Sequence, residues 1–442
     1  MVNKETLRKI LLENRRLVEG KRPFPREISL PSEGGCLLTG IRGAGKSHCL
    51  HAEMQRRLKA GGTWSDMLYL NFEDERLLGF EPSDFGRMLA VHAELSGSSA
   101  PPALFLDEIR VVDGWEIFVR RMADAGADFI VTESAGTTSS VFGERFALVN
   151  VFPLSFSETL QVAGVASDKD ALSSTAGRAA IFRTFARYLK TGGFPECVPL
   201  ENPREALHEL YRTVCTGDVA LRYGIAGVQP LLLALKILAE RTGDPVSFSA
   251  LAKSLEAAGT RLSKATVIRY VEFASRAGLL LPIENIVDRL RQREGRRKYC
   301  FADNGFLHLM GRDDTEELLK NLVAVELMRR HGDNGSVFYV REKVEADFYV
   351  PGEEWAVQVC ADFREDSDGT RRKIRALENI AKILPVKRRT VVTLEEERIV
   401  ETASGSVEVV PAWKWLLGIA SSAIAAQTRK TSVASVRSVG CG

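Results

Sequence analysis

Residues 40–47 read Gly40-Ile41-Arg42-Gly43-Ala44-Gly45-Lys46-Ser47, which fits the pattern G-x-x-x-x-G-K-[ST] at every position. Residues 35–39 before it are apolar enough for a buried strand, and residues 47–58 after it carry apolar side chains at helical spacing. A strand, a glycine-rich loop and a helix in this order form a phosphate cradle, because the loop N–H groups and the helix N-terminus face the anion. The alternative is a glycine turn of another fold, and the complete pattern in its strand-to-helix context favours nucleotide binding.

The pattern assigns roles to individual residues. Lys46 is expected to reach the β- and γ-phosphates of ATP, and the Ser47 hydroxyl is expected to hold Mg²⁺. The expected ATP-binding residues are Gly40, Ile41, Arg42, Gly43, Ala44, Gly45, Lys46, Ser47 and His48.

A second motif supplies the groups that hydrolysis needs. Residues 103–108 read Ala103-Leu104-Phe105-Leu106-Asp107-Glu108, an apolar strand that ends in two carboxylates. Asp107 is expected beside Ser47 as a second ligand of Mg²⁺, and Glu108 is expected to orient a water molecule for attack on the γ-phosphate. The alternative for Glu108 is a solvated surface carboxylate. We therefore expect Lys46 and Glu108 to be catalytic residues of an ATP hydrolase.

Length and charge describe a multidomain protein that is not generally basic. The chain has 442 residues, and since single cores seldom grow past roughly 250 to 300 residues, two or three domains are expected. A formal net charge of +2 leaves only local patches to attract nucleic acid. The seven cysteines and six histidines show neither disulfide nor metal-ligand spacing. No signal segment or membrane-spanning run is evident, so we expect a cytoplasmic protein without a membrane partner.

The segment from residue 230 to 301 has the pattern of a winged helix. Helices are expected over residues 230–241, over 249–258 and from Ser263 onward, and strands over 279–283 and 298–301. A basic run lies between the two strands and would form the wing. The third helix and the wing offer a surface for DNA, against the alternative of a packing unit with a solvated hairpin tip. The candidate DNA-binding residues are Arg269, Arg276, Arg289, Arg291, Arg293, Arg296, Arg297 and Lys298.

Several short motifs recur in this order in a family of prokaryotic AAA-type ATPases, which the chain resembles over roughly residues 5 to 417. They include Asn71-Phe72-Glu73-Asp74, Phe105-Leu106-Asp107-Glu108-Ile109, Pro153-Leu154-Ser155-Phe156, Gly192-Gly193-Phe194-Pro195-Glu196 and Glu345-Ala346-Asp347-Phe348. The resemblance implies an origin-recognition-like ATPase module of the additional-strand type (ASCE), then a winged-helix segment and a C-terminal domain similar to restriction nucleases.

The resemblance also implies a strand at residues 129–132, between the strand of the phosphate loop and the strand of Asp107, with a polar sensor at its tip. That tip reads Thr132-Glu133-Ser134, where the family usually has Thr-Gly-Ser. A carboxylate close to the γ-phosphate would slow hydrolysis unless an arginine or the metal compensates for it. Arg145 matches a Gly-Arg position of the family as a sensor or as a finger toward a neighbouring subunit, against the alternative of a surface arginine.

For the C-terminal domain, the resemblance implies a restriction-type site of two carboxylates and a lysine. Glu326 and Asp347 match the acidic positions, whereas the strand expected to read Glu-x-Lys reads Gln358-Val359-Cys360. This difference removes a metal ligand and a positive charge, so we expect a nuclease-like fold without cutting activity.

The expected fold class is α/β: a P-loop NTPase with an ASCE/AAA-like parallel sheet, followed by a winged helix and a nuclease-like α/β domain. The expected parts are the ATPase core at 1–160, a helical lid at 161–225, the winged helix at 226–302, the nuclease-like domain at 303–418 and a disordered tail at 419–442. The expected function is a slow ATPase with ATP and Mg²⁺ as cofactors, acting as a nucleotide-controlled switch for its C-terminal domains. Two alternatives stay open, a DNA-binding protein for which ATP is only a ligand and an ATP-gated nuclease, and the sequence also leaves oligomerisation open.

Overall fold

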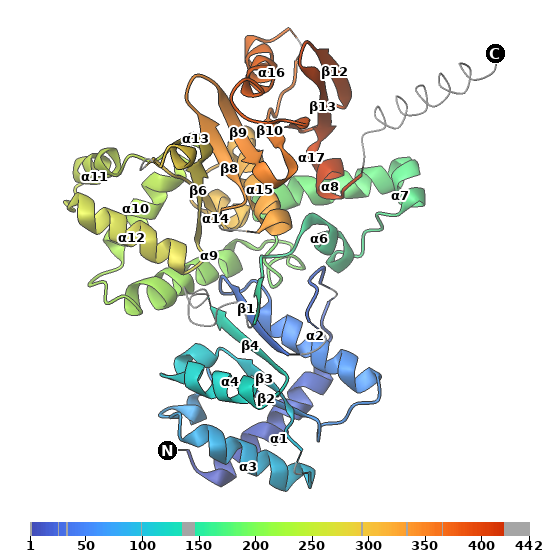
Figure 1. The fold of residues 1–442 in the computed structure, drawn as a ribbon, viewed down its shortest axis with the longest axis vertical. Coiled ribbons are helices and arrows are strands. Elements are labelled where there is room, and N and C mark those ends of the chain that lie inside the picture. The colour runs from blue at the N-terminus through green and yellow to red at the C-terminus, as the bar shows by residue number, and fades with distance from the viewer. Residues whose placement is uncertain are drawn as a thin grey trace. The chain divides into compact units, whose positions relative to one another are not determined.

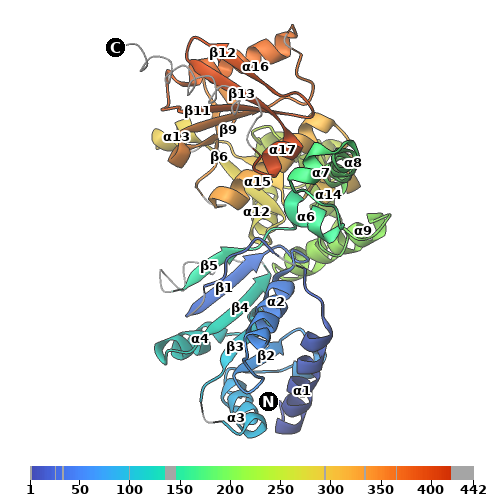
Figure 2. The same ribbon diagram turned by 90° about the vertical axis from the view of Figure 1, so that its right-hand side faces the viewer.

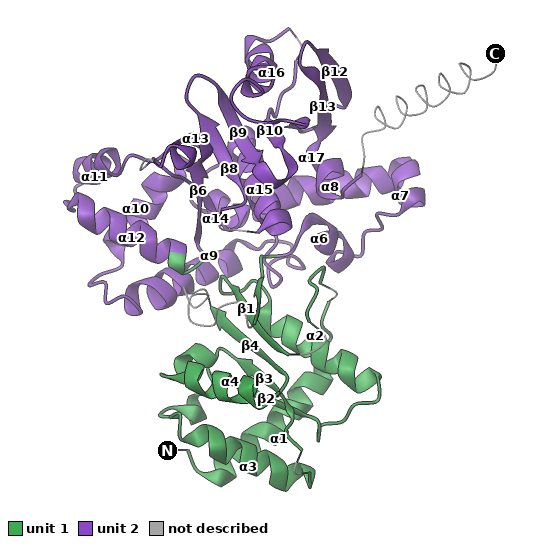
Figure 3. Cartoon of the chain, in the orientation of Figure 1, with its two compact units in different colours: residues 1–153, 276–278 green, residues 154–275, 279–442 purple. Residues whose placement is uncertain are grey.

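The chain folds into two compact units in a computed structural model. Figure 1 and, after a turn of 90°, Figure 2 show the helices and strands, and Figure 3 shows the two units. The first unit holds residues 1–153 and 276–278, and the second holds residues 154–275 and 279–442. The structure describes residues 2–24, 26–31, 34–98, 100–134, 146–292, 295–332, 335–364 and 366–419.

The first unit is built on a parallel sheet with the strand order β2-β3-β4-β1-β5 (Figure 2). The strands are β1 (Gly35–Gly40), β2 (Met67–Asn71), β3 (Ala103–Asp107), β4 (Phe129–Ser134) and β5 (Ala147–Asn150). Strand β4 lies between β1 and β3, which confirms the strand order that the resemblance implies. Because all the strands run the same way, the loops after β1, β2 and β3 leave the sheet at one edge.

Helices cover both faces of this sheet. They are α1 (Lys4–Gly20), α2 (Lys46–Lys59), α3 (Asp84–Ser96) and α4 (Trp115–Asp124), with single 3₁₀ turns η1 (Glu75–Leu77) and η2 (Ile109–Val111). Leu68 and Leu104 of the sheet share one buried cluster with Leu7 of α1, Phe85 of α3 and Phe118 of α4. The rings of Phe85 and Phe118 stack with centroids 3.9 Å apart. Helix α2 packs against β1, β3 and β4.

The second unit begins with helices and ends with a large sheet. Its first helices are α6 (Phe156–Val162), α7 (Lys169–Ser173), α8 (Thr175–Thr191), α9 (Arg204–Thr213), the π-helix η4 (Val214–Leu221), α10 (Gln229–Ala239), α11 (Phe248–Ala257) and α12 (Lys264–Arg276). The later ones are α13 (Ile286–Leu290), α14 (Asn304–Leu309), α15 (Thr315–His331), η5 (Pro351–Glu353), α16 (Asp368–Ile380) and α17 (Ala412–Leu416).

The sheet of the second unit has the strand order β12-β13-β11-β10-β9-β8-β6-β7 among the described residues. Its strands are β6 (Leu280–Asn285), β7 (Lys298–Phe301), β8 (Phe338–Arg341), β9 (Glu345–Val350), β10 (Trp355–Val359), β11 (Arg388–Thr393), β12 (Arg398–Thr402) and β13 (Gly405–Pro411). β6 pairs with β7 on one side and with β8 on the other. The expected domain boundary near residue 302 therefore falls within one continuous sheet.

The elements expected for a winged helix are present as α10, α11, α12, β6 and β7, with the Ser263 side chain capping α12 through a bond from Thr266 N at 3.1 Å. The basic run differs from a plain hairpin tip, because it begins in helix α13, whose Ile286 and Val287 are buried. The expected tail from residue 420 onward lies outside the described residues. Within the described part, no helix has both the length and the apolar character needed to cross a bilayer.

Candidate nucleotide-binding site

The glycine-rich loop joins the end of β1 to the start of α2. A Cβ atom on Gly40 would lie 2.2 Å from the Val151 carbonyl oxygen, so only glycine fits there. Gly45 precedes α2 with a φ of 97°, a conformation that other residues rarely adopt. Arg26 braces the loop by donating to the Ala44 carbonyl at 2.9 Å and to the Phe152 carbonyl at 2.8 Å. The loop backbone thus holds the shape that the sequence pattern predicts for a phosphate cradle.

Lys46 is 4% exposed and points back across the loop. Its ammonium donates to the carbonyls of Gly40 at 3.0 Å and Ile41 at 3.3 Å, and to Ser134 Oγ at 3.1 Å. The Glu108 carboxylate lies 3.6 Å from the same nitrogen. The two residues that the sequence analysis names as catalytic therefore meet in the structure.

Asp107 lies at the tip of β3 and is 1% exposed. Its carboxylate accepts hydrogen bonds from Thr132 Oγ1 at 2.5 Å, from the Tyr69 hydroxyl at 3.2 Å and from the Ser47 side chain. Burial raises the pKa of Asp107, and the bonds from Thr132 and Ser47 oppose that rise. Ser47 and Asp107 are thus brought together, as expected for a pair of Mg²⁺ ligands. The described residues contain no cluster of three or more Asp, Glu, His or Cys side chains suited to a metal.

Glu108 follows β3 in the left-handed region, with a φ of 48° and a ψ of 42°. This backbone turn directs its carboxylate to Ser134, which donates through its backbone N at 3.0 Å and its hydroxyl at 2.6 Å. Burial alone would raise the pKa of Glu108, but the Lys46 ammonium and the Ser134 hydrogen bonds outweigh it and hold that pKa below its ordinary value. A non-glycine residue in this region costs of order 1–3 kcal/mol, and such residues gather at functional sites.

Strand alternation decides which side chain of β4 faces the site. Thr132 and Ser134 contact Asp107 and Glu108, whereas the buried Glu133 has its carboxylate 3.9 Å from Arg110. Successive side chains point to opposite faces of a sheet, so Glu133 lies on the face of β4 opposite to Thr132 and Ser134. Arg110 is the arginine placed to compensate its charge, and the effect of Glu133 on hydrolysis stays a prediction. Ser134 and Tyr69 were not assigned from the sequence, and the alternation within residues 132–134 is the signal that could have found Ser134.

Other predicted residues flank the loop. Arg42 forms an ion pair with Glu73 at 2.8 Å, and the His48 ring stacks on Phe24 with centroids 4.5 Å apart. Arg145 lies outside the described residues, so its role as a sensor or finger stays a prediction.

Comparison with known families identifies the first unit. A family model described as an AAA domain matches residues 33–160, and a second model, described as a domain of unknown function, matches residues 182–317. The first unit has the fold of an AAA-type P-loop domain. The description of the second model names neither a winged helix nor a nuclease.

Full-length relatives are similar to both units together. An uncharacterized protein of Methanocaldococcus jannaschii is 27% identical over 440 residues, covering 94% of this chain and 96% of the relative. An uncharacterized protein of Haemophilus influenzae is 24% identical over 401 residues, covering 86% and 94%. The AMPPCP-bound DnaA from Aquifex aeolicus matches at 14% identity over 55% of this chain and 82% of that chain, with a TM-score of 0.24.

The candidate DNA-binding residues separate into several groups. Arg269, Arg276 and Arg296 are exposed. Lys298 is a correction, because it is 4% exposed with its ammonium 4.8 Å from the centre of the Tyr339 ring, and burial lowers its pKa. A buried lysine of this kind cannot serve as a surface contact. Arg293 lies outside the described residues.

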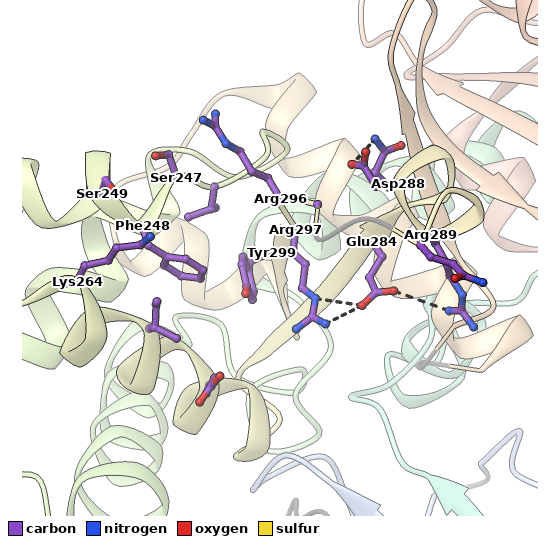
Figure 4. Close-up of a pocket in the computed structure, with 16 residues that line it drawn as sticks. Ser247, Phe248, Ser249, Lys264, Glu284, Asp288, Arg289, Arg296, Arg297 and Tyr299 are labelled. Carbon is purple, nitrogen blue, oxygen red and sulfur yellow. Dashed lines mark hydrogen bonds and ion pairs between the residues drawn. The ribbon is translucent and has the colours of Figure 1, made fainter.

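The other three arginines of the basic run are paired with carboxylates. Arg297 and Arg289 both turn toward Glu284, at 2.7 and 3.8 Å (Figure 4). Arg291 pairs with Glu342. Arg289, Arg296 and Arg297 border a pocket of about 690 Å³ between α11, α12 and the basic run. The Arg296 side chain extends away from Glu284 in Figure 4. Much of the basic charge expected for a DNA surface is therefore already paired with carboxylates of the same chain.

The two acidic residues of the nuclease-like pattern have partners within the second unit. Glu326 pairs with Arg329 at 2.9 Å and with Arg330 at 2.7 Å, and no contact joins it to Asp347 among the described residues. Asp347 accepts from Val359 N at 2.9 Å. Glu316, ten residues before Glu326 and so ~15 Å along α15, is the carboxylate that reaches the end of β10, through a bond from Ala361 N. Glu326 is thus paired along its own helix, and the match of Glu326 and Asp347 to the acidic positions of a nuclease site stays a prediction.

Two lysines that the sequence analysis did not name accompany Glu316. Lys373 donates to Glu316 at 2.6 Å and to the Val359 carbonyl at 2.5 Å, and Lys320 lies 3.1 Å from Glu316. Gln358 donates to the Glu345 carbonyl at 2.8 Å, so its amide is used within the sheet.

Proposed function

We propose that the first unit binds ATP with Mg²⁺, hydrolyses it slowly, and uses the nucleotide state to set the arrangement of the second unit. One observation carries the proposal. The Lys46 ammonium, the Ser47 hydroxyl and the carboxylates of Asp107 and Glu108 converge beside a glycine-rich loop in an AAA-type fold. These are the groups that P-loop ATPases use for phosphate, metal and water.

Binding is expected to replace internal contacts of Lys46 by phosphate contacts. The loop N–H groups and the N-terminus of α2 favour an anion, and the ammonium can exchange the carbonyls of Gly40 and Ile41 for phosphate oxygens. Ser47 and Asp107 are the residues that would hold Mg²⁺ together with phosphate oxygens and water. When bound, the metal neutralises charge on the phosphates.

Hydrolysis is expected to depend on the release of Glu108. Its lowered pKa keeps the carboxylate charged and able to orient a water molecule, as a general base must be. That carboxylate is bound to Ser134 and lies beside Lys46, so it must turn before it can serve the water. This requirement supports a slow cycle suited to a switch.

Phosphate release tests the proposal. The wild type should release phosphate from ATP in the presence of Mg²⁺, and Lys46→Ala and Glu108→Gln should each lose at least ~100-fold. Glu108→Gln should keep ATP binding, whereas Lys46→Ala should weaken it. Lys59→Ala on the exposed end of α2 and Glu5→Gln on α1 are matched controls that should behave as wild type. Turnover that survives in both active-site variants would overturn the proposal.

DNA binding is a second candidate function, supported by exposed Arg269, Arg276 and Arg296 on or beside the helices and strands expected for a winged helix. Phosphate release with and without duplex DNA separates it from ATP hydrolysis alone. An ATP-gated nuclease is the least supported alternative, since Gln358 and Cys360 stand where a carboxylate and a lysine are needed. Mg²⁺-dependent cleavage that is lost in Asp347→Ala would support it.

A further inference from the structure

A groove of about 620 Å³ lies on the first unit beside the nucleotide-binding site. One wall is the segment 72–82, which follows β2, and the other wall is the segment 111–113, which follows β3. Because β1, β2 and β3 are parallel, both walls leave the sheet at the edge that also carries the glycine-rich loop.

Two apolar side chains stand out from the walls. Leu78 is 92% exposed and Val111 is 63% exposed. Leu78 has a φ of −56° and a ψ of 124°, and Gly79 after it has a φ of 80°. A hydrogen bond from Phe80 N to the Leu77 carbonyl at 2.8 Å closes this turn, which is of type II. The backbone therefore holds Leu78 outward between two buried neighbours.

The floor of the groove is part of the hydrophobic core. Phe72, Leu77, Phe80 and Val112 line the groove and also belong to the main buried cluster of the unit. The rings of Phe72 and Phe80 meet edge to face with centroids 5.2 Å apart. Packing of this kind fixes the shape of the groove before any partner arrives.

The lining is acidic, with five carboxylates and neither lysine nor arginine among the described residues. Glu73 is balanced by Arg42 at 2.8 Å and Asp74 by Arg76 at 2.6 Å. The other three carboxylates form no ion pair within the described part of the chain, and they are Glu75, Glu81 and Asp113. The groove is therefore lined by two exposed apolar side chains and by three carboxylates without ion-pair partners in the described residues. Such a lining complements a partner surface that is both apolar and basic.

We propose that this groove binds a basic segment of a partner protein. The segment places an apolar side chain against Leu78 and Val111, and its lysine or arginine side chains face Glu75, Glu81 and Asp113.

Both walls of the groove connect to the nucleotide-binding residues. Arg42 of the loop is paired with Glu73 of the groove, and Val111 lies one short turn after Glu108. A basic side chain that reaches Glu73 competes with Arg42, so partner binding and ATP binding alter each other by the same factor. This coupling rests on the proposed function, whereas the binding itself does not.

The binding is tested without nucleotide, using a fluorescent amphipathic peptide of lysine and leucine and a matched peptide of glutamate and leucine. The wild type should bind the basic peptide and not the acidic one. The double variant Glu75→Lys, Glu81→Lys should bind the basic peptide at least ~10-fold more weakly, and Leu78→Ser should weaken it in the same direction. The control Glu201→Lys, Glu395→Lys reverses the same number of exposed charges elsewhere and should bind like the wild type. Equal affinity in the groove variant and this control would overturn the proposal.

Two further measurements separate the neighbouring possibilities. If light scattering shows that the wild type self-associates and that Glu75→Lys, Glu81→Lys abolishes it, the occupant is a second copy and the partner proposal is wrong. Addition of ATP and Mg²⁺ should shift the peptide affinity of the wild type several-fold and leave Lys46→Ala unchanged. If the peptide binds but ATP does not change its affinity for the wild type, the proposed coupling is wrong and the proposed peptide binding is kept.

Discussion

The sequence pattern does not predict the contact between the Tyr69 hydroxyl and Asp107. The Tyr69 hydroxyl donates to the Asp107 carboxylate at 3.2 Å, and His51 Nε2 lies 3.2 Å from the Tyr69 hydroxyl oxygen. Burial lowers the pKa of His51 to about 4, so the ring is neutral near pH 7. Since the phenol uses its proton for Asp107, His51 must carry its own proton on Nε2. His51 lies one helical turn after Ser47, so one face of α2 serves both the metal ligand and its support.

Removal of this hydroxyl should weaken the hold on Mg²⁺. In Tyr69→Phe, Asp107 loses one of the hydrogen bonds that orient it, and partners of this kind typically contribute ~10- to 100-fold to metal affinity. We expect the Mg²⁺ concentration needed for half-maximal binding of a fluorescent ATP analogue to rise by about tenfold. Tyr349→Phe, which removes a hydroxyl bonded to the Pro385 carbonyl in the second unit, is the control. An unchanged Mg²⁺ requirement in Tyr69→Phe would show that the contact is incidental.

The sequence predicted which residues form this site better than it predicted which way their side chains point. The pattern from Gly40 to Ser47 and the pair Asp107 and Glu108 are local signals, because a few neighbouring residues determine the shape of the loop and the end of a strand. The contact of Ser134 with Glu108 depends on which face of β4 is turned to β3, and that depends on the register of two strands distant in sequence.

At the scale of elements, the turn at Gly192 and Gly193 meets helix α14 at Asp303. The Asp303 carboxylate accepts from Gly193 N at 2.8 Å and from Gly305 N at 2.7 Å. A Cβ atom on Gly192 would lie 1.5 Å from the same carboxylate. The two glycines, to which the sequence analysis assigned no chemical role, therefore leave room for a buried carboxylate. Through this contact the end of α8 is joined to the start of α14.

Asp303 should make the stability of the second unit depend on pH. Burial raises its pKa from 3.8 to about 7, so the folded state binds the proton more tightly than the unfolded state. The contribution is fully present below pH 3.8 and is lost as the pH rises through 7, up to about 4 kcal/mol at 1.36 kcal/mol per pKa unit. Asp303→Asn stays neutral, so its melting temperature should fall less than that of the wild type between pH 5 and 8. Parallel pH profiles for the two proteins would contradict this.

Helix and strand positions were predictable where local spacing is strong, as α10, α11 and β7 show by ending within two residues of the expected bounds. The pairing of charges was not predictable, because Glu284 meets Arg297 and Arg289 only through the sheet and helix α13. For the same reason the contacts of Glu316 with Ala361 and Lys373 were missed. A helix face cannot be assigned to a partner before the neighbouring elements are known.

At the scale of the whole molecule, β6 and β7 share a sheet with the C-terminal strands, so the segment expected to contact DNA and the nuclease-like segment are parts of one compact unit. We therefore expect a conformational change in one of these two segments to alter the conformation of the other. The AAA-type unit is a separate compact unit.

Glu284 should limit any attraction of the second unit to DNA. In Glu284→Gln, the guanidinium groups of Arg297 and Arg289 lose their carboxylate and become available to phosphates. We expect affinity for duplex DNA at low salt to rise about tenfold, with a steeper salt dependence, because each added phosphate contact releases counterions. Glu354→Gln, which releases Lys387 elsewhere, is the control for added positive charge. An unchanged affinity would remove this surface from consideration.

The central claim is that the loop at residues 40–47 encloses the phosphates of ATP, and direct binding tests it before any turnover is measured. Titration of the folded protein with a fluorescent ATP analogue at millimolar Mg²⁺ should give saturable binding that unlabelled ATP displaces. The affinity should fall at least ~10-fold in Lys46→Ala and remain unchanged in Lys59→Ala. A correctly folded wild type that shows no binding under these conditions would contradict the account.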